Sequence, residues 1–346
     1  MRTTRSGGMF LIIGENIHAT RTVLRSGRHV GTAPDGRDAI QFESEGGERR
    51  YLAIPEALKD GQDFRAGKVK HVQAALLALL TDSPDAPDAR AYVETLARRQ
   101  IKAGADFIDL NVDEVAQDAA TQRTAMRLLV EIVEGLGSSA PALDSSNSTV
   151  IQAGIEASKD PSRLLLNSAS AERLDVLDMA ASAHCAVVVS AAGTTGLPSG
   201  VDDRVANAEK IVAEATGRGL APAALHVDPL VIPVAVNPEA GAEFLEAVRR
   251  IRDTFGVEIH ITGGLSNVSF GMPGRRLVND VFIDMAAEAG ADSGIVDPVA
   301  GDMGRVFGRD RGSRSYILAA NLLNGTDQYG MDFLEAFRAG ELAQDL

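Results

Sequence analysis

The feature that most constrains this fold is a repeated alternation of short apolar runs with longer segments of helical periodicity. We expect strands in eight runs, which are 10–17, 106–111, 141–146, 163–170, 186–193, 225–233, 258–264 and 293–298. The segments between these runs carry apolar residues three and four positions apart, and several end in glycine, as helices commonly do. Strands joined by helices of this length form a parallel sheet through right-handed crossovers.

Eight such strand–helix units over about 250 residues are typical of a (β/α)8 TIM barrel, which we predict as a single domain over residues 1–346. A doubly wound open sheet is the alternative, but no GxGxxG turn follows the first strand. Aromatic residues make up only 4% of the chain and Trp is absent, so Ala, Val, Leu and Ile must build the core. Such a core is usual in parallel α/β proteins.

Residues 18–67 interrupt the alternation with a polar, arginine-rich and glycine-containing stretch that directly follows the first strand. Because the segment leaving a barrel strand emerges on the face that carries chemistry, we expect this insertion on the catalytic face. Two interpretations of it stay open. It is either a floppy tail or dimer contact, or a partly ordered lid or docking surface.

Charge and cysteine content exclude several classes of function. The formal net charge of −14 argues against a nucleic-acid partner. Cys185 is the only cysteine, which excludes an internal disulfide and a cysteine-rich zinc or iron–sulfur site. The N-terminal apolar run is too short for a signal peptide, and no run approaches the roughly 18 residues of a membrane span. We therefore predict a cytoplasmic protein without a membrane partner.

The ends of the expected strands are rich in small polar side chains. These residues are Glu15, Asn16, Asp109, Asn111, Asp144, Ser146, Asn147, Asn167, Ser168, Asp228, Ser266, Asn267 and Asp297. In a barrel, all of them would converge on one mouth. Any single one could instead cap a loop or helix, as Asp144 could before the helix that follows it.

The chemistry of this set favours an organic ring. Carboxylates accept paired N–H donors, and carboxamides both donate and accept. With no Arg or Lys at the strand ends, the set suits a planar amino-amide heterocycle such as a pterin better than a phosphate. The two glycines in "ITGGLSNVSFG", 263 and 264, would let the backbone approach a flat ligand closely. A magnesium site built on Asp109, Asp144 and Asp228 is the competing interpretation.

Several segments resemble the pterin-binding methyltransferases, a group within the dihydropteroate synthase-like superfamily. The group includes methyltetrahydrofolate:corrinoid methyltransferases and the folate module of cobalamin-dependent methionine synthase. The resemblance covers the first strand and residues from about 70 to 325. The segments that carry it are "LIIGENI", "GADFIDLNV", "LDSSNSTVIQAGIEA", "LLLNSASAER", "TGLPSGVDDR", "VDPLVIPV" and "GGLSNVSFG".

The resemblance implies a role for each matching residue. Asp144, Asn167 and Asp228 would bind the amino and amide edges of the pterin ring. Asn267 would form a hydrogen bond near the methyl-bearing N5 and, with Asp144, make up the catalytic pair. The predicted substrate-binding residues are Asp109, Asn111, Asp144, Asn167, Asp228, Gly264, Ser266 and Asn267, with no metal ligands among them.

The implied reaction moves a methyl group between N5 of tetrahydrofolate and the cobalt of a corrinoid (cobalamin). Either direction is open, including transfer from a methylcorrinoid to tetrahydrofolate in a demethylation pathway, and 5-methyltetrahydrofolate is the methylated folate. No histidine lies in the D-x-H-x-x-G arrangement of corrinoid modules, so we expect a separate corrinoid-binding protein as partner. The resemblance also implies a homodimer.

Three other activities are weighed against this one. Dihydropteroate synthases use a lysine near the end of strand seven and an arginine–histidine pair at strand eight, and "TGGLSN" and "IVDP" lack these cations here. Synthase activity is therefore not expected. A metal-dependent barrel lyase or isomerase using the strand-end aspartates, and a folate-binding subunit without turnover, remain alternatives.

Overall fold

The computed structural model describes residues 3–81, 83–194 and 196–344. The barrel strands are β1 (Leu11–His18), β7 (Phe107–Asn111), β8 (Ala140–Asp144), β9 (Leu165–Ala169), β10 (Ala186–Ser190), β11 (Leu225–Asp228), β12 (His260–Ile261) and β13 (Ser293–Val296). They form one sheet in the order β12-β11-β10-β9-β8-β7-β1-β13. Beyond the end of β12, the Ile295 N–H donates to the Gly263 carbonyl at 2.9 Å, which joins the two outer strands. The predicted (β/α)8 barrel is confirmed.

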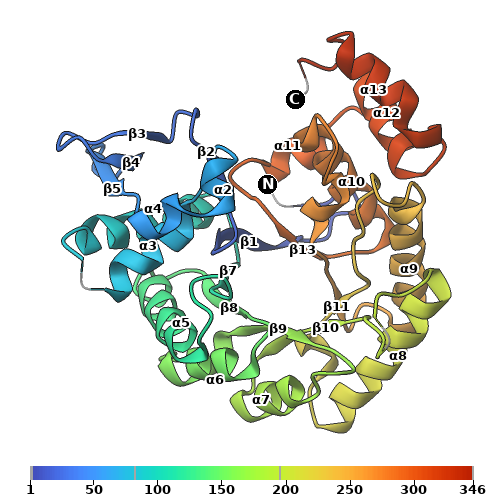
Figure 1. Ribbon diagram of the computed structural model, residues 1–346. Helices are drawn as coiled ribbons and strands as arrows, with labels where there is room; N and C mark the ends of the chain where they lie inside the picture. The colour runs from blue at the N-terminus through green and yellow to red at the C-terminus, as the bar shows by residue number, and fades with distance from the viewer. Residues whose placement is uncertain (1–2, 82, 195, 345–346) are drawn as a thin grey trace. The chain divides into compact units, whose positions relative to one another are not determined.

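Helices alternate with these strands, as Figure 1 shows. The longer ones are α3 (His71–Leu80), α4 (Ala86–Lys102), α5 (Ala119–Glu134), α6 (Ser148–Ala157), α7 (Asp175–Ala183), α8 (Val201–Gly217), α9 (Ala240–Phe255), α10 (Arg275–Ala289), α11 (Met303–Gly308), α12 (Arg314–Leu323) and α13 (Met331–Arg338). Single 3-10 turns are η1 (Pro161–Arg163), η2 (Pro222–Ala224), η3 (Leu265–Ser269) and η4 (Gln328–Gly330).

Two compact units make up the chain. One contains Met1–Ile13 and Leu166–Leu346, and the other contains Gly14–Leu165. We call them the C-terminal unit and the N-terminal unit. Each is described separately below, and the single domain expected from the sequence stays a prediction.

The insertion is an ordered, β-rich part of the N-terminal unit. Its elements are β2 (Thr22–Leu24), β3 (Val30–Thr32), β4 (Asp38–Glu43), β5 (Arg49–Ala53), α1 (Glu56–Lys59) and α2 (Gln62–Arg65), followed by β6 (Lys68–Lys70). Strands β3, β4 and β5 form an antiparallel sheet, and β2 pairs with β6. Phe42 packs edge-on against Tyr92 of α4, with ring centroids 5.0 Å apart. The interpretation as a floppy tail is therefore wrong.

Both ends of the insertion attach to the carboxyl end of β7. The Ala19 N–H donates to the Asn111 carbonyl at 2.9 Å. At the other end, Lys70 Nζ lies 2.7 Å from Glu114 Oε2 in the loop after β7. The insertion thus starts and ends beside the carboxyl end of β7, and its place on a catalytic face stays a prediction.

Six of the expected strands end earlier than predicted, and β11 and β12 are two examples. Strand β11 stops at Asp228, although the run 225–233 continues through Val231 and Ile232. Leu230 has φ of 70°, which breaks an extended chain, and its N–H donates to Asp228 Oδ1 at 2.8 Å. Strand β12 covers only His260–Ile261, because Gly264 begins the turn η3. Apolar runs predict burial, but side-chain caps fix where these strands end.

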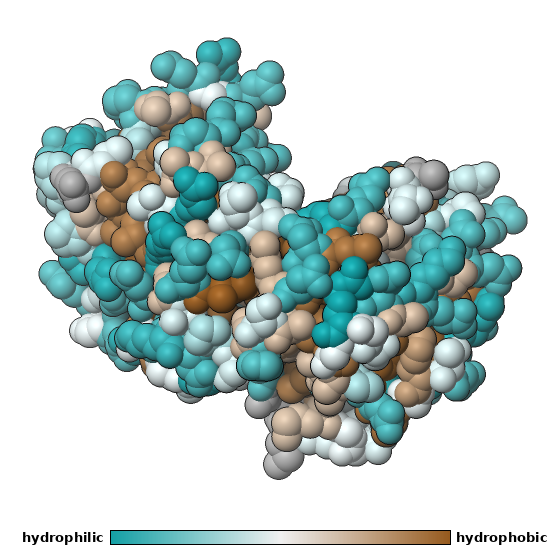
Figure 2. All heavy atoms as spheres, turned by 90° about the horizontal axis from the view of Figure 1, so that it is seen from below, coloured by the Kyte–Doolittle hydropathy of each residue, from teal (hydrophilic) through white to brown (hydrophobic). Residues whose placement is uncertain are grey.

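The core is aliphatic, and several of its buried polar groups have charged or hydrogen-bonding partners. Asp280 and Asp284 on α10 are each 1% exposed and pair with arginines from α11 and from the segment after it. Tyr316 donates to Asp284 Oδ2 at 2.8 Å, and in the N-terminal unit the Tyr92 hydroxyl lies 2.9 Å from His71 Nδ1. Polar residues cover most of the face in Figure 2, with apolar patches between them. Among the described residues, no helix is long and apolar enough to cross a membrane.

A stacked pair of histidines, one of them buried, lies within the C-terminal unit. His226 in β11 stacks on His260 in β12, with ring centroids 4.6 Å apart. His226 is 2% exposed, whereas Nδ1 of His260 lies 2.9 Å from Asp292 Oδ2. Burial, followed by the neighbouring charge of His260, lowers the pKa of His226 to about 3. The folded protein therefore keeps this imidazole neutral in a pH range where an unfolded chain would protonate it.

This burial predicts a loss of stability in acid. The unfolded-state pKa of His226 is near 6.5 and the folded-state pKa is lower, so the unfolded state binds more protons below about pH 6.5. Protonation of His226 in the unfolded state should lower the free energy of unfolding as the pH drops from about 6.5 toward 3. The loss should reach up to about 1.4 kcal/mol per pH unit. Urea unfolding of H226Q should show a shallower pH dependence over this range, while the exposed-site control H184N keeps the slope of the unmodified protein. An equal slope in H226Q and the unmodified protein would contradict the assignment.

Candidate functional site

In the N-terminal unit, β7 and β8 bring three predicted site residues together. Asp109 and Asn111 are two positions apart on β7, so their side chains leave the same face of the strand. Asn111 pairs in register with Asp144 at the end of β8, and Asn111 Nδ2 donates to Asp144 Oδ2 at 2.9 Å. Asp109 and Asn111 are buried, whereas a quarter of the Asp144 side chain is exposed. Asp144 is thus held in place with part of its carboxylate open.

Asp144 is not the N-cap of the helix that follows it. The N-cap of α6 is Asn147, whose side chain accepts from the Thr149 N–H at 3.0 Å. Next to it, Asp113 in the loop after β7 accepts from the Ser145 hydroxyl and from the Ser146 N–H. These bonds hold the chain on both sides of Asp144 and leave its carboxylate free of a capping role. The helix-cap interpretation of Asp144 is wrong.

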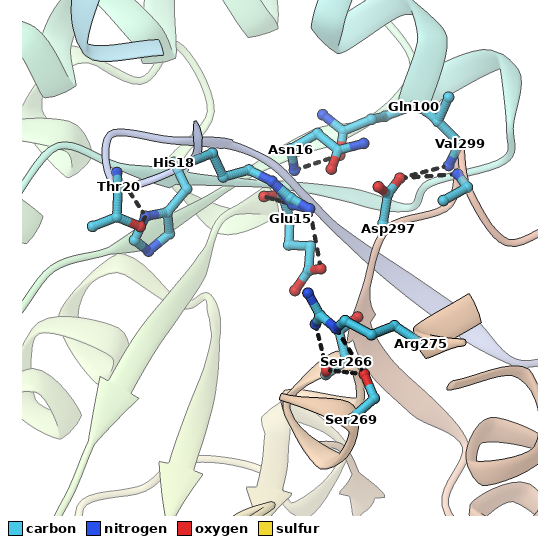
Figure 3. A network of polar contacts seen from close by, with 12 residues as sticks. Glu15, Asn16, His18, Thr20, Gln100, Ser266, Ser269, Arg275, Asp297 and Val299 are labelled. Carbon is cyan, nitrogen blue, oxygen red and sulfur yellow. Dashed lines mark hydrogen bonds and ion pairs between the residues drawn. The ribbon is translucent and has the colours of Figure 1, made fainter. Parts of the chain in front are cut away.

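His18, at the end of β1, is a second neighbour of Asp144. Its Nε2 lies 3.5 Å from Asp144 Oδ2. Its Nδ1 lies 3.3 Å from the Thr20 N–H and 2.7 Å from the Thr20 hydroxyl, and Figure 3 shows the ring beside Thr20. Because a backbone N–H can only donate, Nδ1 is the accepting nitrogen, and the proton of a neutral imidazole is then on Nε2. That proton faces Asp144.

In the C-terminal unit, the glycines after β12 make room for polar side chains. A Cβ on Gly263 would lie 3.3 Å from Asp228 Oδ1, and one on Gly264 would lie 2.6 Å from Asn267 Nδ2. The Asn267 N–H also donates to the Gly264 carbonyl at 2.9 Å, which closes the turn η3. Glycine is needed here because the carboxamide of Asn267 occupies the space of a side chain at position 264.

Asp228 is a strand-end carboxylate whose ionisation is strongly perturbed. Burial raises its pKa to about 6, while the Leu230 N–H and the charge of Arg204 act in the opposite direction. Arg204, on α8, is fully buried, and its guanidinium nitrogens have no hydrogen-bond partner among the described residues. Its nearest carboxylate oxygen, on Glu243, is 3.5 Å away. A buried guanidinium thus acts on Asp228 through space.

A further guanidinium reaches the loop after β12 from the start of α10. Arg275 Nε donates to Ser269 Oγ at 3.0 Å, and Nη2 donates to the Ser266 carbonyl at 3.1 Å. Figure 3 shows this side chain extending to both serines. Arg275 thus contacts the loop after β12 from a helix, and Arg204 acts on Asp228 through space from another, although neither is a strand-end residue.

The remaining strand-end residues divide between loop structure and the site. Asp297 accepts from the Val299 and Ala300 N–H groups, so it shapes the loop after β13. Asn167 lies in β9 and is partly buried, as is Ser168 beside it. The binding roles of Asn167, Asp228, Gly264, Ser266 and Asn267 stay predictions, as do those of Asp109, Asn111 and Asp144.

Sequence reasoning missed His18, Arg204 and Arg275. His18 lies two residues after the strand-end residue Asn16, so its position in the sequence already indicated that it lies near the strand ends. The two arginines carried no such signal, because long side chains on helices reach distant backbone. Among the described residues, no group of three or more His, Cys, Asp or Glu side chains could hold a metal ion. The competing aspartate metal site has no such cluster to support it.

Comparison with known proteins gives a consistent result. The profile of a family described as pterin binding enzyme matches residues 87–297. A methylcorrinoid:tetrahydrofolate methyltransferase of Eubacterium limosum is 29% identical over 257 residues, which is 73% of this chain and 89% of that protein. A methionine synthase of Mycobacterium leprae is 28% identical over 77% of this chain, but the match spans only 22% of that protein. A dihydropteroate synthase of Xanthomonas albilineans shares the fold, with a TM-score of 0.51, 16% identity, and coverage of 65% of this chain and 85% of that one.

The surroundings of Gly264 and Gly241 predict different losses of stability when each is replaced by alanine. A Cβ on Gly264 meets the end of a flexible side chain, so G264A should lower the free energy of unfolding by less than about 1 kcal/mol while displacing the carboxamide of Asn267. A Cβ on Gly241 would lie 2.3 Å from the backbone carbonyl of Leu323, so G241A should cost at least about 2 kcal/mol. Urea unfolding measures both, and equal losses would contradict the geometry.

Proposed function

The chain belongs to the pterin binding enzyme family, and we propose that it is a methyltransferase acting between tetrahydrofolate and a corrinoid. The observation that carries this proposal is the similarity to the Eubacterium limosum methyltransferase along most of that protein's length. The geometry agrees with it. In the N-terminal unit, the Asn111 carboxamide donates to the Asp144 carboxylate at the strand ends, and such groups suit the amino and amide edges of a pterin.

The finer form of the proposal is transfer from a methylcorrinoid to N5 of tetrahydrofolate. The N5 lone pair attacks the methyl carbon, the cobalt–carbon bond breaks with both electrons left on cobalt, and the proton of N5 is released. The reverse reaction consumes one proton and returns the methyl group to cobalt. No D-x-H-x-x-G segment occurs in the sequence, so the corrinoid substrate is supplied by a separate corrinoid-binding protein.

Within this proposal, Asn267 acts at N5. Its carboxamide accepts from N5–H through the oxygen and donates to an unprotonated N5 through the nitrogen. Gly264 leaves room for this amide, and the glycine backbone beside it can approach the flat ring. Asp144, held by Asn111 and facing His18, binds ring N–H groups. A homodimer stays a prediction.

The central experiment measures binding and turnover separately. Titration calorimetry should show binding of tetrahydrofolate and of 5-methyltetrahydrofolate. A spectral assay with free cob(I)alamin and 5-methyltetrahydrofolate should then show conversion to methylcobalamin. Folate binding without turnover would favour a binding subunit. Activity that is lost to chelators and indifferent to folates would favour a metal-dependent lyase or isomerase.

The proposed role of Asn267 predicts that its loss slows methyl transfer more than it weakens folate binding. N267A should slow methyl transfer by about 100-fold, because the group that handles N5 is lost, and weaken 5-methyltetrahydrofolate binding by less than about 10-fold. Single-turnover kinetics and calorimetry measure the two effects. G264A, which displaces the same amide, should act in the same direction. Loss of binding with unchanged turnover would refute this role.

The position of the His18 ring predicts that H18Q and H18N differ in their affinity for tetrahydrofolate. In H18Q the amide nitrogen replaces Nε2 and still donates toward Asp144, whereas in H18N the amide reaches only the position of Nδ1. Tetrahydrofolate should therefore bind H18Q within about 3-fold of the unmodified protein and H18N about 10-fold more weakly. H18L should match H18N. If H18Q is as impaired as H18L, the donor to Asp144 does not matter.

A further inference from the structure

The guanidinium of Arg204 is a buried cation in the C-terminal unit. Arg204 lies in the first turn of α8, and its side chain has no exposed surface. A long cationic side chain is seldom buried completely unless it has charged or hydrogen-bonding partners. None of its three guanidinium nitrogens has a hydrogen-bond partner among the described residues. Hydrogen bonding within the fold therefore does not explain why this cation is buried.

Two carboxylates supply the negative charge that opposes this cation. Glu243 Oε2 on α9 lies 3.5 Å from Arg204 Nη2, and 21% of the Glu243 side chain is exposed. Burial lowers the pKa of Arg204, and the charges of Glu243 and then of Asp228 oppose that effect. Helix α8 packs against both α9 and β11, which carry these two residues. Arg204 thus couples a carboxylate on a helix to a carboxylate at a strand end.

The surroundings of Asp228 make Arg204 its main charged neighbour. The Asp228 carboxylate accepts from the Leu230 N–H at 2.8 Å. Strand β10 contributes the uncharged Ser190, in register with Asp228, and β12 is followed by the uncharged Thr262. Burial raises the pKa of Asp228 to about 6, and the charge of Arg204 acts in the opposite direction. A carboxylate with so few donors depends on that charge to stay ionised.

Two histidines lie on the same strands as these groups. His226 is two residues before Asp228, and its pKa of about 3 keeps it neutral over the range in which Asp228 titrates. His260 in β12 stacks on His226, and its Nδ1 lies 2.9 Å from Asp292 Oδ2. The charge that shifts the pKa of Asp228 comes from Arg204 rather than from either histidine.

The packing beside Asp228 brings its carboxylate close to α9. A Cβ on Gly263 would lie 3.3 Å from Asp228 Oδ1 and 3.2 Å from Phe244 Cε2. Phe244 is fully buried and directly follows Glu243 on α9. Asp228 is itself partly exposed, so its carboxylate is open to a ligand while Arg204 is not.

We propose that Arg204 is a positioning residue of the folate site, whose guanidinium holds the Asp228 carboxylate in its ionised form while Glu243 limits this effect. The inference rests on the proposed function, because Asp228 binds a ring only if a folate occupies the strand ends. An ionised carboxylate offers acceptors to the amino and amide N–H groups, whereas protonation replaces one acceptor with an O–H donor. Arg204 is too deeply buried to contact the ring, so it acts through Asp228.

The pH dependence of tetrahydrofolate binding tests the proposal. Titration calorimetry should show full affinity well above pH 6 and a fall as the pH drops through about 6, because Asp228 is then protonated. In R204M the cation is lost and the pKa of Asp228 rises. The midpoint of the fall should therefore move up by about one pH unit, and affinity at neutral pH should drop about 5-fold. In E243Q the nearest anion of Arg204 is lost, so the midpoint should move to lower pH.

Two control variants separate this role from a structural one. R204K keeps a positive charge at the same position and should restore the midpoint of the unmodified protein. R218M removes the arginine at the C-cap of the same helix, whose Nε lies 3.0 Å from Asp178 Oδ1, and should leave the midpoint unchanged. General damage to the fold would move R204M and E243Q in the same direction, whereas the proposal requires opposite shifts.

Several results would overturn the proposal. One is a midpoint that moves in the same direction in R204M and E243Q, or in neither. Another is a pH step that persists in D228N, since a different group would then titrate. If R204M does not fold, the direction of the shift in E243Q decides the outcome. If the unmodified protein binds no tetrahydrofolate at any pH, the proposed function itself fails.

Discussion

The hydrogen bonds that hold β13 between β1 and β12 are the constraint on which the polar rim of the C-terminal unit depends. The Leu11 N–H donates to the Asp292 carbonyl at 2.8 Å, and the Ile295 N–H donates to the Gly263 carbonyl at 2.9 Å. A strand bonded on both sides cannot slip by one residue without turning its side chains to the opposite face. Gly263 and Gly264 are therefore fixed at the strand end, and Asp228 and Asn267 are placed against them.

The carboxylates of this protein are stabilised in three different ways. Asp280 is buried between two guanidinium groups, and Asp144 has the Asn111 amide and His18 beside it. Asp228 has only one backbone N–H donor and a distant buried cation, and its pKa of about 6 follows from that shortage. Asp228 is thus a carboxylate that can change protonation state near neutral pH when a ligand adds a donor or an acceptor.

The barrel could be predicted from the sequence because each parallel strand is buried on both faces and reads as a continuous apolar run. The ends of strands could not, since Leu230 leaves the extended conformation inside such a run. The strands of the insertion were missed because charged and polar residues interrupt their apolar ones, as in DAIQFE of β4 and RRYLA of β5. At the site, the position of a short side chain such as Asp144 or Asn267 follows from the position of its backbone. The guanidinium groups of Arg204 and Arg275 lie several ångströms from their own helices. The neighbouring residues in the sequence therefore do not predict which groups these two arginines affect.

The chain has no Trp and four Tyr, and two of these phenols are buried against titratable partners. Tyr92 lies against His71 in the N-terminal unit, and Tyr316 against Asp284 in the C-terminal unit. Each unit therefore contains its own ultraviolet chromophore in a polar contact that exists only when that unit is folded. Replacing the buried Tyr of one unit by Phe would let a spectroscopist follow the melting of the other through its buried phenol, without adding a label.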